Sequence, residues 1–154
     1  MRTLALLVGL CAVASAQTFP AASGETLSGK KVDLPAAFGG TAVVVVGFTH
    51  ASQNQTKAWA QRLKGEAWSI AVLQDVPRLV RGMAVHGIKS GTPKEAYDRF
   101  VLLYKGEKEL KDAADFSTPD DAYVVVVDGS GAIRWRFHGA VTDAAVEQVR
   151  AQLK

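Results

Sequence analysis

The sequence has almost no cysteine, with only Cys11 among its 154 residues. One thiol excludes an internal disulfide, a CxxC redox pair and a structural zinc site built on cysteines. Beyond the first 16 residues there is no long apolar stretch, so we expect the rest of the chain to be soluble. An excess of charge is also missing. The net charge of +3 is too small to indicate nucleic-acid binding by itself.

Residues 1–16, MRTLALLVGLCAVASA, have the parts of a secretory signal peptide. Arg2 supplies the positive region, residues 4–13 the apolar region and residues 14–16 an A-x-A cleavage site. The apolar region is shorter than the roughly 20 residues of a membrane-spanning helix. We therefore predict cleavage after Ala16 and export to the periplasm or the medium. The mature domain, residues 17–154, then contains no cysteine.

The rest of the chain alternates apolar strands with helices. Residues 41–48 form a continuous β-branched run, which is typical of a strand buried on both faces of a sheet. The patterns predict strands at 19–22, 30–34, 41–48, 68–73, 99–104, 122–127 and 132–137, and helices at 53–64, 77–86 and 107–114, followed by a C-terminal helix. This order predicts one α/β domain, with a central mixed β-sheet flanked by helices and an N-terminal β-hairpin.

Local signals refine three of the helices. Ser52 and Gln55 have the spacing of a capping box at the start of the helix 53–64. Thr142 is expected to cap the C-terminal helix. In the helix 77–86, apolar residues recur at helical spacing and predict a buried face, and Gly87 is expected to end the helix. That apolar set consists of Val76, Leu79, Val80 and Met83.

The order of elements resembles the thioredoxin fold in its redoxin form, as in peroxiredoxins. The segment 43–55, VVVVGFTHASQNQ, lies where that superfamily places its reactive site, and it is similar to the GFTHCPxxC stretch of copper-delivering Sco-type proteins. On that register Ala51 and Gln55 replace the two cysteines. On a peroxiredoxin register Ser52 replaces the reactive cysteine, and Ala122 occupies the place of the superfamily's cis-proline. Both registers imply that thiol chemistry is lost, because a serine hydroxyl cannot follow the redox cycle of a thiolate.

Four segments, 19–35, 46–59, 75–91 and 123–139, together resemble bacterial relatives of the mitochondrial ATP synthase assembly factor family, named for ATPase-complex subunit ten. The features most specific to that family are the LSGK-V-LP opening, the pair Gln55 and Trp59, and the D-x-x-G-x-IRW hairpin. For the mitochondrial members, the resemblance implies help in folding or assembling a membrane subunit of the ATP synthase.

We therefore expect a protein-binding, chaperone or assembly module of the cell envelope, without cofactor and without thiol redox activity. Its partner would be a protein that the sequence does not identify. The candidate binding loop consists of Thr49, His50, Ala51, Ser52 and Gln55, together with Ala122 from a neighbouring strand.

Alternatives remain open at this point. The chain could be a redoxin-derived enzyme, such as a peroxidase or oxidoreductase, or a metal-binding protein using His50, although no histidine pair has a metal-ligand spacing. Hydrolysis by Ser52 and His50 would lack a G-x-S-x-G elbow and an evident acid partner. Arg78, Arg81 and Lys89 form a locally basic segment, either a membrane-surface contact or an ordinary solvated helix face.

Overall fold

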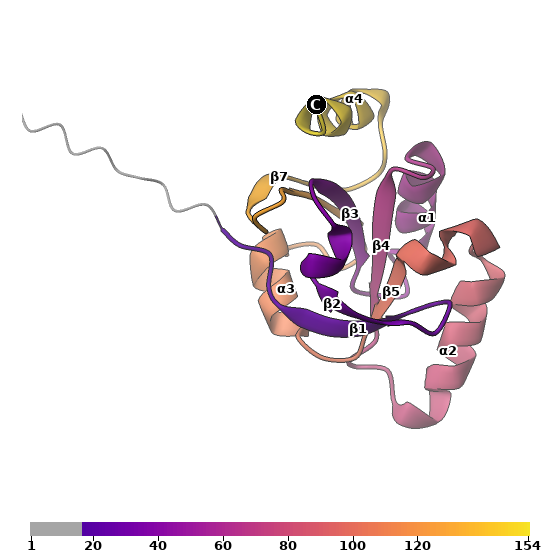
Figure 1. Cartoon of the computed structure of the whole chain (residues 1–154). Coiled ribbons are helices and arrows are strands. Elements are labelled where there is room, and N and C mark those ends of the chain that lie inside the picture. Colours follow the sequence, from indigo (N-terminus) through magenta and orange to yellow (C-terminus); the bar gives the residue numbers. More distant parts are fainter. Residues whose placement is uncertain (1–16) are drawn as a thin grey trace, which may run out of the picture.

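The computed structural model describes residues 17–154, so the predicted signal peptide lies outside the described residues. The chain folds around a seven-stranded mixed sheet with the order β2-β1-β5-β4-β3-β6-β7 (Figure 1). The strands are β1 Ala22–Thr26, β2 Lys31–Leu34, β3 Ala42–Gly47, β4 Ala67–Val72, β5 Phe100–Leu103, β6 Tyr123–Val127 and β7 Ile133–His138.

Within residues 17–154, four α-helices flank this sheet, and Figure 1 shows how they are arranged around it. They are α1 Gln53–Arg62, α2 Arg78–Ser90, α3 Glu107–Ala114 and α4 Asp143–Gln152, and two 3-10 helices are η1 Ala36–Phe38 and η2 Lys94–Arg99. In the part of the chain that the structure describes, no helix is long and apolar enough to cross a membrane.

Strand β3 is the centre of the sheet because it pairs in parallel with β4 and antiparallel with β6. Val44 and Val46 point into the layer that α3 covers, and Val43 and Val45 point into the layer that α1 and α4 cover. All four are essentially inaccessible to solvent. Burial of each such side chain contributes roughly 1.5–3 kcal/mol, so the β-branched run of the sequence contributes strongly to the stability of the sheet.

The predicted α/β class, mixed sheet and N-terminal hairpin are confirmed, with a shift in the hairpin. The first strand is Ala22–Thr26 rather than 19–22, so Gly24, which the predicted strands leave in the connecting segment, lies inside it. A Cβ atom at Gly24 would lie 2.6 Å from Cγ1 of Val101 on the adjacent strand β5. This glycine therefore permits a close approach between strands, which its sequence context does not reveal.

The prediction for α2 is wrong in two respects. The helix does not end at Gly87 but continues to Ser90, and three of the four apolar residues are outside: Leu79 is 98% exposed, Met83 77% and Val80 42%, whereas Val76 is partly buried. Ile88 is buried instead, in a small cluster with Leu27, Leu73 and Leu102. A glycine within a helix costs only about 1 kcal/mol, which packing of this cluster offsets.

Candidate functional site

The six residues of the predicted binding loop lie together, but they are not equally accessible. His50 and Ala51 are exposed, Thr49 and Gln55 are partly buried, and Ser52 and Ala122 are fully buried. Strands β3 and β6 bring the two parts together, because Val46 pairs with Tyr123. We call residues 48–55 the 48–55 loop, since they connect β3 to the first turn of α1.

The side chain of Gln55 joins this loop to the start of β6. The backbone N–H of Ala122 donates to Oε1 of Gln55 at 2.8 Å, and Nε2 of Gln55 donates to Oδ1 of Asp121 at 3.3 Å. Gln55 thus occupies a backbone donor that would otherwise lie buried without a partner. An unsatisfied buried N–H costs about 1–3 kcal/mol, so this contact holds the loop closed.

The predicted capping box of Ser52 and Gln55 is wrong. Ser52 already has helical backbone angles, φ −74° and ψ −8°, whereas a capping serine needs an extended backbone to reach the N–H groups of the first turn. Its hydroxyl donates to the carbonyl oxygen of Thr49 at 2.8 Å. The predicted cap at Thr142 is confirmed, because Oγ1 accepts from the N–H of Ala145 at 3.1 Å.

Asp121 and His138 extend the polar contacts around the loop, and sequence reasoning missed both. Nδ1 of His138 lies 2.8 Å from Oδ2 of Asp121, and the imidazole stacks on the ring of Tyr123 with centroids 5.3 Å apart. The hydrogen bond with His138 holds the pKa of Asp121 below its ordinary value, against a smaller opposing effect of burial. The alternation of β7 and the register of the predicted hairpin could have placed His138 near the start of β6.

A further hydrogen bond holds the 48–55 loop against the segment before β6, because Oγ1 of Thr49 donates to the carbonyl oxygen of Pro119 at 2.8 Å. Because the Ser52 hydroxyl is buried and bonded to backbone, it is not available as a nucleophile for His50. Among residues 17–154, no three histidine, cysteine or carboxylate side chains gather closely enough to share a metal ion. The residues of the 48–55 loop that are exposed to another molecule are His50, Ala51 and Asn54.

A large cavity opens beside this loop, and we call it the α1–α2 groove. It has a volume of about 980 Å³ and runs between α1 and α2 over β4 and β5. Thr49, His50 and Ser52 line its end at the 48–55 loop. Gly65 and Arg99 line the groove where α1 and η2 end, and Nη1 of Arg99 donates to the carbonyl oxygen of Gly65.

The groove exists because β4 carries small residues on one face. Ala67, Ser69 and Ala71 line the cavity with short side chains, and Ile70 and Val72 between them also line it while packing into the layer under α3. Small side chains do not fill the space between two helices that lie on the same face of a sheet. The alternation of small and large residues along 67–72 is the sequence signal that could have indicated this groove.

The two rims of the groove differ in chemistry. Lys57 on α1 and Lys64, two residues beyond the end of α1, line the cavity, and neither forms an ion pair with any of the described residues. The ammonium group of Lys57 reaches across to Gly91, where a Cβ atom would lie 2.8 Å from it. On α2, Met83 and Gly87 line the cavity.

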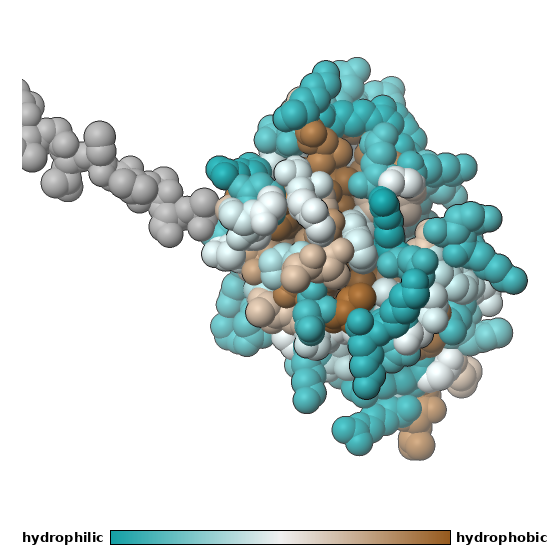
Figure 2. All heavy atoms as spheres, viewed as in Figure 1, coloured by the Kyte–Doolittle hydropathy of each residue, from teal (hydrophilic) through white to brown (hydrophobic). Residues whose placement is uncertain are grey.

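Apolar surface continues beyond the groove along α2. Leu79 and Val80 are exposed next to Met83 in the first turns of the helix. Figure 2 shows hydrophobic side chains protruding from a largely hydrophilic surface at the lower end of the molecule, where α2 begins in Figure 1. Carboxylates also line the cavity, at Asp75, Glu95 and Glu107.

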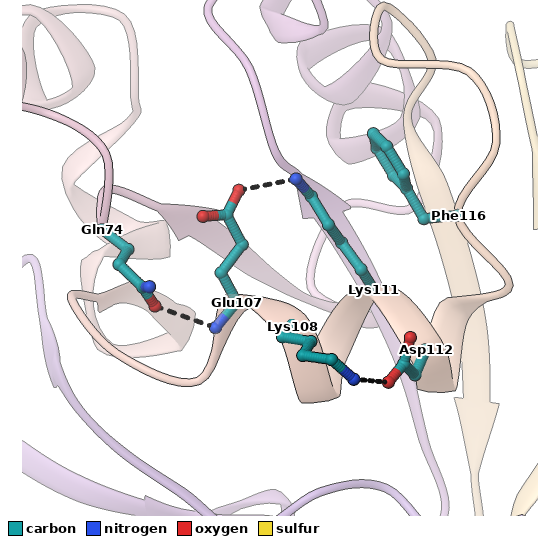
Figure 3. Close-up of a pocket in the computed structure, with 6 residues that line it drawn as sticks. All are labelled: Gln74, Glu107, Lys108, Lys111, Asp112 and Phe116. Atoms are coloured by element: carbon teal, nitrogen blue, oxygen red, sulfur yellow. Dashed lines mark hydrogen bonds and ion pairs between the residues drawn. The ribbon is translucent and has the colours of Figure 1, made fainter.

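A second cavity, of about 410 Å³, lies over α3, and its charged side chains are paired (Figure 3). Lys111 contacts Glu107 at 2.9 Å, and Lys108 contacts Asp112 at 2.9 Å. The ammonium group of Lys111 also lies 4.6 Å from the ring centroid of Phe116. The charged side chains of this cavity are thus paired with one another, as in an ion-pair network that stabilises the fold.

The three basic residues predicted on α2 differ in their contacts. Nε of Arg81 donates to the carbonyl oxygen of Val76 at 3.0 Å, and its guanidinium lies 4.9 Å from the ring centroid of Tyr104. Arg78 and Lys89 are exposed. Arg81 therefore holds α2 against the sheet, and contact with a membrane surface through Arg78 and Lys89 stays a prediction.

The chain matches a known protein family over nearly its whole length, and its fold is similar to that of solved structures. The family described as ATP10 protein matches residues 12–153. None of the curated proteins matches the chain. Among solved structures, the thioredoxin domain of a thiol-disulfide oxidoreductase from Bacteroides vulgatus is similar, with 20% identity and a TM-score of 0.59 over 92% of this chain and 99% of that one.

Two further solved structures have the same fold. The exposed lipoprotein thioredoxin Etrx1 from Streptococcus pneumoniae has 13% identity and a TM-score of 0.57 over 86% of this chain and 99% of that one. BsSco, a member of the Sco family of cytochrome c oxidase assembly proteins, has 13% identity and a TM-score of 0.52 over 89% and 94%. At these identities the likeness establishes the thioredoxin-like fold that the sequence predicted.

Proposed function

The chain belongs to the ATP10 protein family, and from this premise we propose that it is an exported, thiol-independent binding module that assists the assembly of a membrane protein complex. The family resemblance implies assembly work on the ATP synthase for the mitochondrial members. The similarity to BsSco, from a family of assembly proteins, indicates that a thioredoxin-like domain is suited to such work.

One observation carries the thiol-independent part of the proposal. The positions that correspond to reactive cysteines hold Ala51, Ser52 and Gln55, and Gln55 uses its side chain to bond Ala122 and Asp121. A thiolate is the nucleophile of disulfide exchange and of peroxide reduction. A domain that has replaced the thiol by an internal hydrogen bond retains the fold as a binding scaffold.

Export is part of the proposal because of the signal-peptide pattern in residues 1–16. Mass spectrometry of the protein recovered from the source cells tests it. We expect an N-terminus at Gln17 and recovery with the envelope or the medium. An intact Met1 terminus in the cytoplasmic fraction would overturn export.

The assembly role is tested by comparing cells that lack the gene with cells that carry Cys11→Ser. We expect less assembled ATP synthase on native gels of the membranes without the gene, and a normal amount with Cys11→Ser, because the only thiol lies in the predicted signal peptide. A normal amount without the gene contradicts the assembly role. A loss with Cys11→Ser, with the protein present at its usual level, contradicts thiol independence.

A biochemical assay complements the test in cells. The purified protein should neither reduce insulin with dithiothreitol as electron donor nor turn over hydrogen peroxide. Turnover above the background of the reagents would revive the redoxin-derived enzyme.

A further inference from the structure

We propose that the α1–α2 groove binds an amphipathic α-helix of a partner polypeptide, with the apolar side of that helix on the floor of the groove and its carboxylates at Lys57 and Lys64. This inference rests on the proposed function, because it names the chemistry of the segment that the binding module would hold. It assigns the binding to the groove rather than to the 48–55 loop.

The apolar surface fits a polypeptide better than a small molecule. Inside the groove, Ala67 and Ala71 leave a shallow floor on β4. Outside it, Met83 and Leu79 continue the apolar surface along α2, and both are largely exposed. A ligand enclosed by the cavity would leave Leu79 in water, whereas a helix with an apolar stripe covers the floor and the rim together. Methionine adapts its shape to such partners.

The basic rim sets the charge of the occupant. Lys57 lies on α1 and Lys64 lies two residues beyond the end of that helix, and both are exposed and line the cavity. Neither lysine forms an ion pair with the described residues. Carboxylates on the flank of a bound helix would therefore meet two unpaired ammonium groups, whereas a fatty acid offers a single carboxylate.

The carboxylates that line the groove come from other segments. Asp75 follows β4, Glu95 belongs to η2, and Glu107 is paired with Lys111. They disfavour a polyanion such as a nucleic acid, and leave Lys57 and Lys64 as the cations that an acidic helix flank would meet.

The probe for this inference is a fluorescein-labelled 18-residue helical peptide, with leucines along one face and two glutamates on one flank. Its fluorescence anisotropy is measured with the protein purified from cells. We expect binding by the wild type and at least tenfold weaker binding by the double variant Lys57→Glu, Lys64→Glu. A peptide with lysines in place of the two glutamates should bind the double variant better than the wild type. The control is Lys31→Glu on the distant strand β2, which should bind like the wild type.

A second variant keeps the inference testable if the charge changes disturb the fold. Met83 is exposed, so Met83→Lys should fold normally and lose peptide binding by about tenfold. No binding by the wild type, or equal binding by the wild type and both variants, overturns the inference. Binding of the fluorescent fatty acid cis-parinaric acid without binding of the peptide also overturns it, in favour of an acyl ligand.

The same variants separate this inference from the proposed function. If Lys57→Glu, Lys64→Glu cells assemble a normal ATP synthase while cells without the gene do not, the groove is not the binding site and the assembly role stands. If cells without the gene also assemble it normally, the proposed function fails, whatever the peptide shows.

Discussion

Two regions beside helix α1 differ in how completely their groups are satisfied, and they meet at Thr49, His50 and Ser52. The 48–55 loop is closed by hydrogen bonds from Gln55 to Asp121 and from the Ala122 N–H to Gln55. The α1–α2 groove leaves Lys57 and Lys64 without ion pairs among the described residues and exposes Met83. The loop lies at the place of the superfamily's chemistry, whereas the groove is an open cavity with exposed side chains along its rims.

The difference indicates which surface can bind a partner in a thioredoxin-like domain that lacks the reactive cysteines. Throughout residues 17–154, no buried side-chain nitrogen or oxygen lacks a hydrogen-bond partner. The hydrogen bonds of the 48–55 loop therefore have a structural role, because they join α1 to the start of β6. Exposed apolar side chains beside unpaired cations have no comparable internal purpose, so they indicate an interface.

The largest effect should come from Trp59→Ala, which loosens α1 and so removes both regions at once. Trp59 is fully buried, packs edge-on against Phe137, and its indole N–H donates to the carbonyl oxygen of Gly139 at 2.9 Å. Loss of such a side chain costs about 3–5 kcal/mol of unfolding free energy. Urea denaturation measures it, and Trp59→Phe should lose less. A cost below about 1 kcal/mol would mean that α1 is held by other contacts.

A smaller effect should follow from Gln55→Ala, which opens the loop without touching the groove. The buried N–H of Ala122 then lacks its acceptor, and the expected loss is about 1–3 kcal/mol. Gln53→Ala is the matched control, because Gln53 lies on the same helix and its side chain makes no hydrogen bond in the structure. Equal losses in the two variants would contradict the role assigned to Gln55.

The pH dependence of the stability of Asp121→Asn tests the same hydrogen bonds, and we expect a smaller effect. The pKa of Asp121 is held below its ordinary value of 3.8, chiefly by the hydrogen bond with His138. The ionised carboxylate therefore stabilises the fold at pH values above the ordinary pKa of 3.8, and this contribution is lost as the pH falls through the lower folded-state pKa.

Wild type should exceed Asp121→Asn in urea stability at pH 6, and the difference should shrink towards pH 2. A difference that is constant over this range would show that the carboxylate does not act through its charge.

The smallest effect on stability should come from the groove rim. The double variant Leu79→Lys, Met83→Lys changes only exposed side chains, so the free energy of unfolding should stay within about 0.5 kcal/mol of wild type. Thermal unfolding checks this expectation. A marked destabilisation would mean that these side chains already pack against something within the fold.

Much of the fold could be predicted from sequence because the central strands β3 and β6 are continuous β-branched runs separated from the helices by turn residues. Residues 107–114 were predicted as α3 with the observed bounds. The prediction for α2 failed because three apolar residues at helical spacing usually mark a core face, and here they mark an exposed one. The pattern records amphipathicity, but not which side of the helix meets the sheet.

The site was predictable only in part, for a different physical reason. The sequence placed the 48–55 loop at the end of the central strand and next to Ala122. It did not reveal that Gln55 would turn towards Ala122 rather than back to Ser52, because that choice depends on a donor 67 residues away. Nor did it reveal the groove, which results from small residues on β4 facing the space between two helices.

The most direct test of the central claim is an NMR titration of the ¹⁵N-labelled protein with the acidic amphipathic peptide. The account predicts that the largest amide shifts occur at Lys57, Lys64 and Met83, on the two rims of the groove, while Ala122 and His138 stay unchanged. Shifts concentrated at Ala122 and His138, with the groove unaffected, would contradict it and return the binding site to the 48–55 loop.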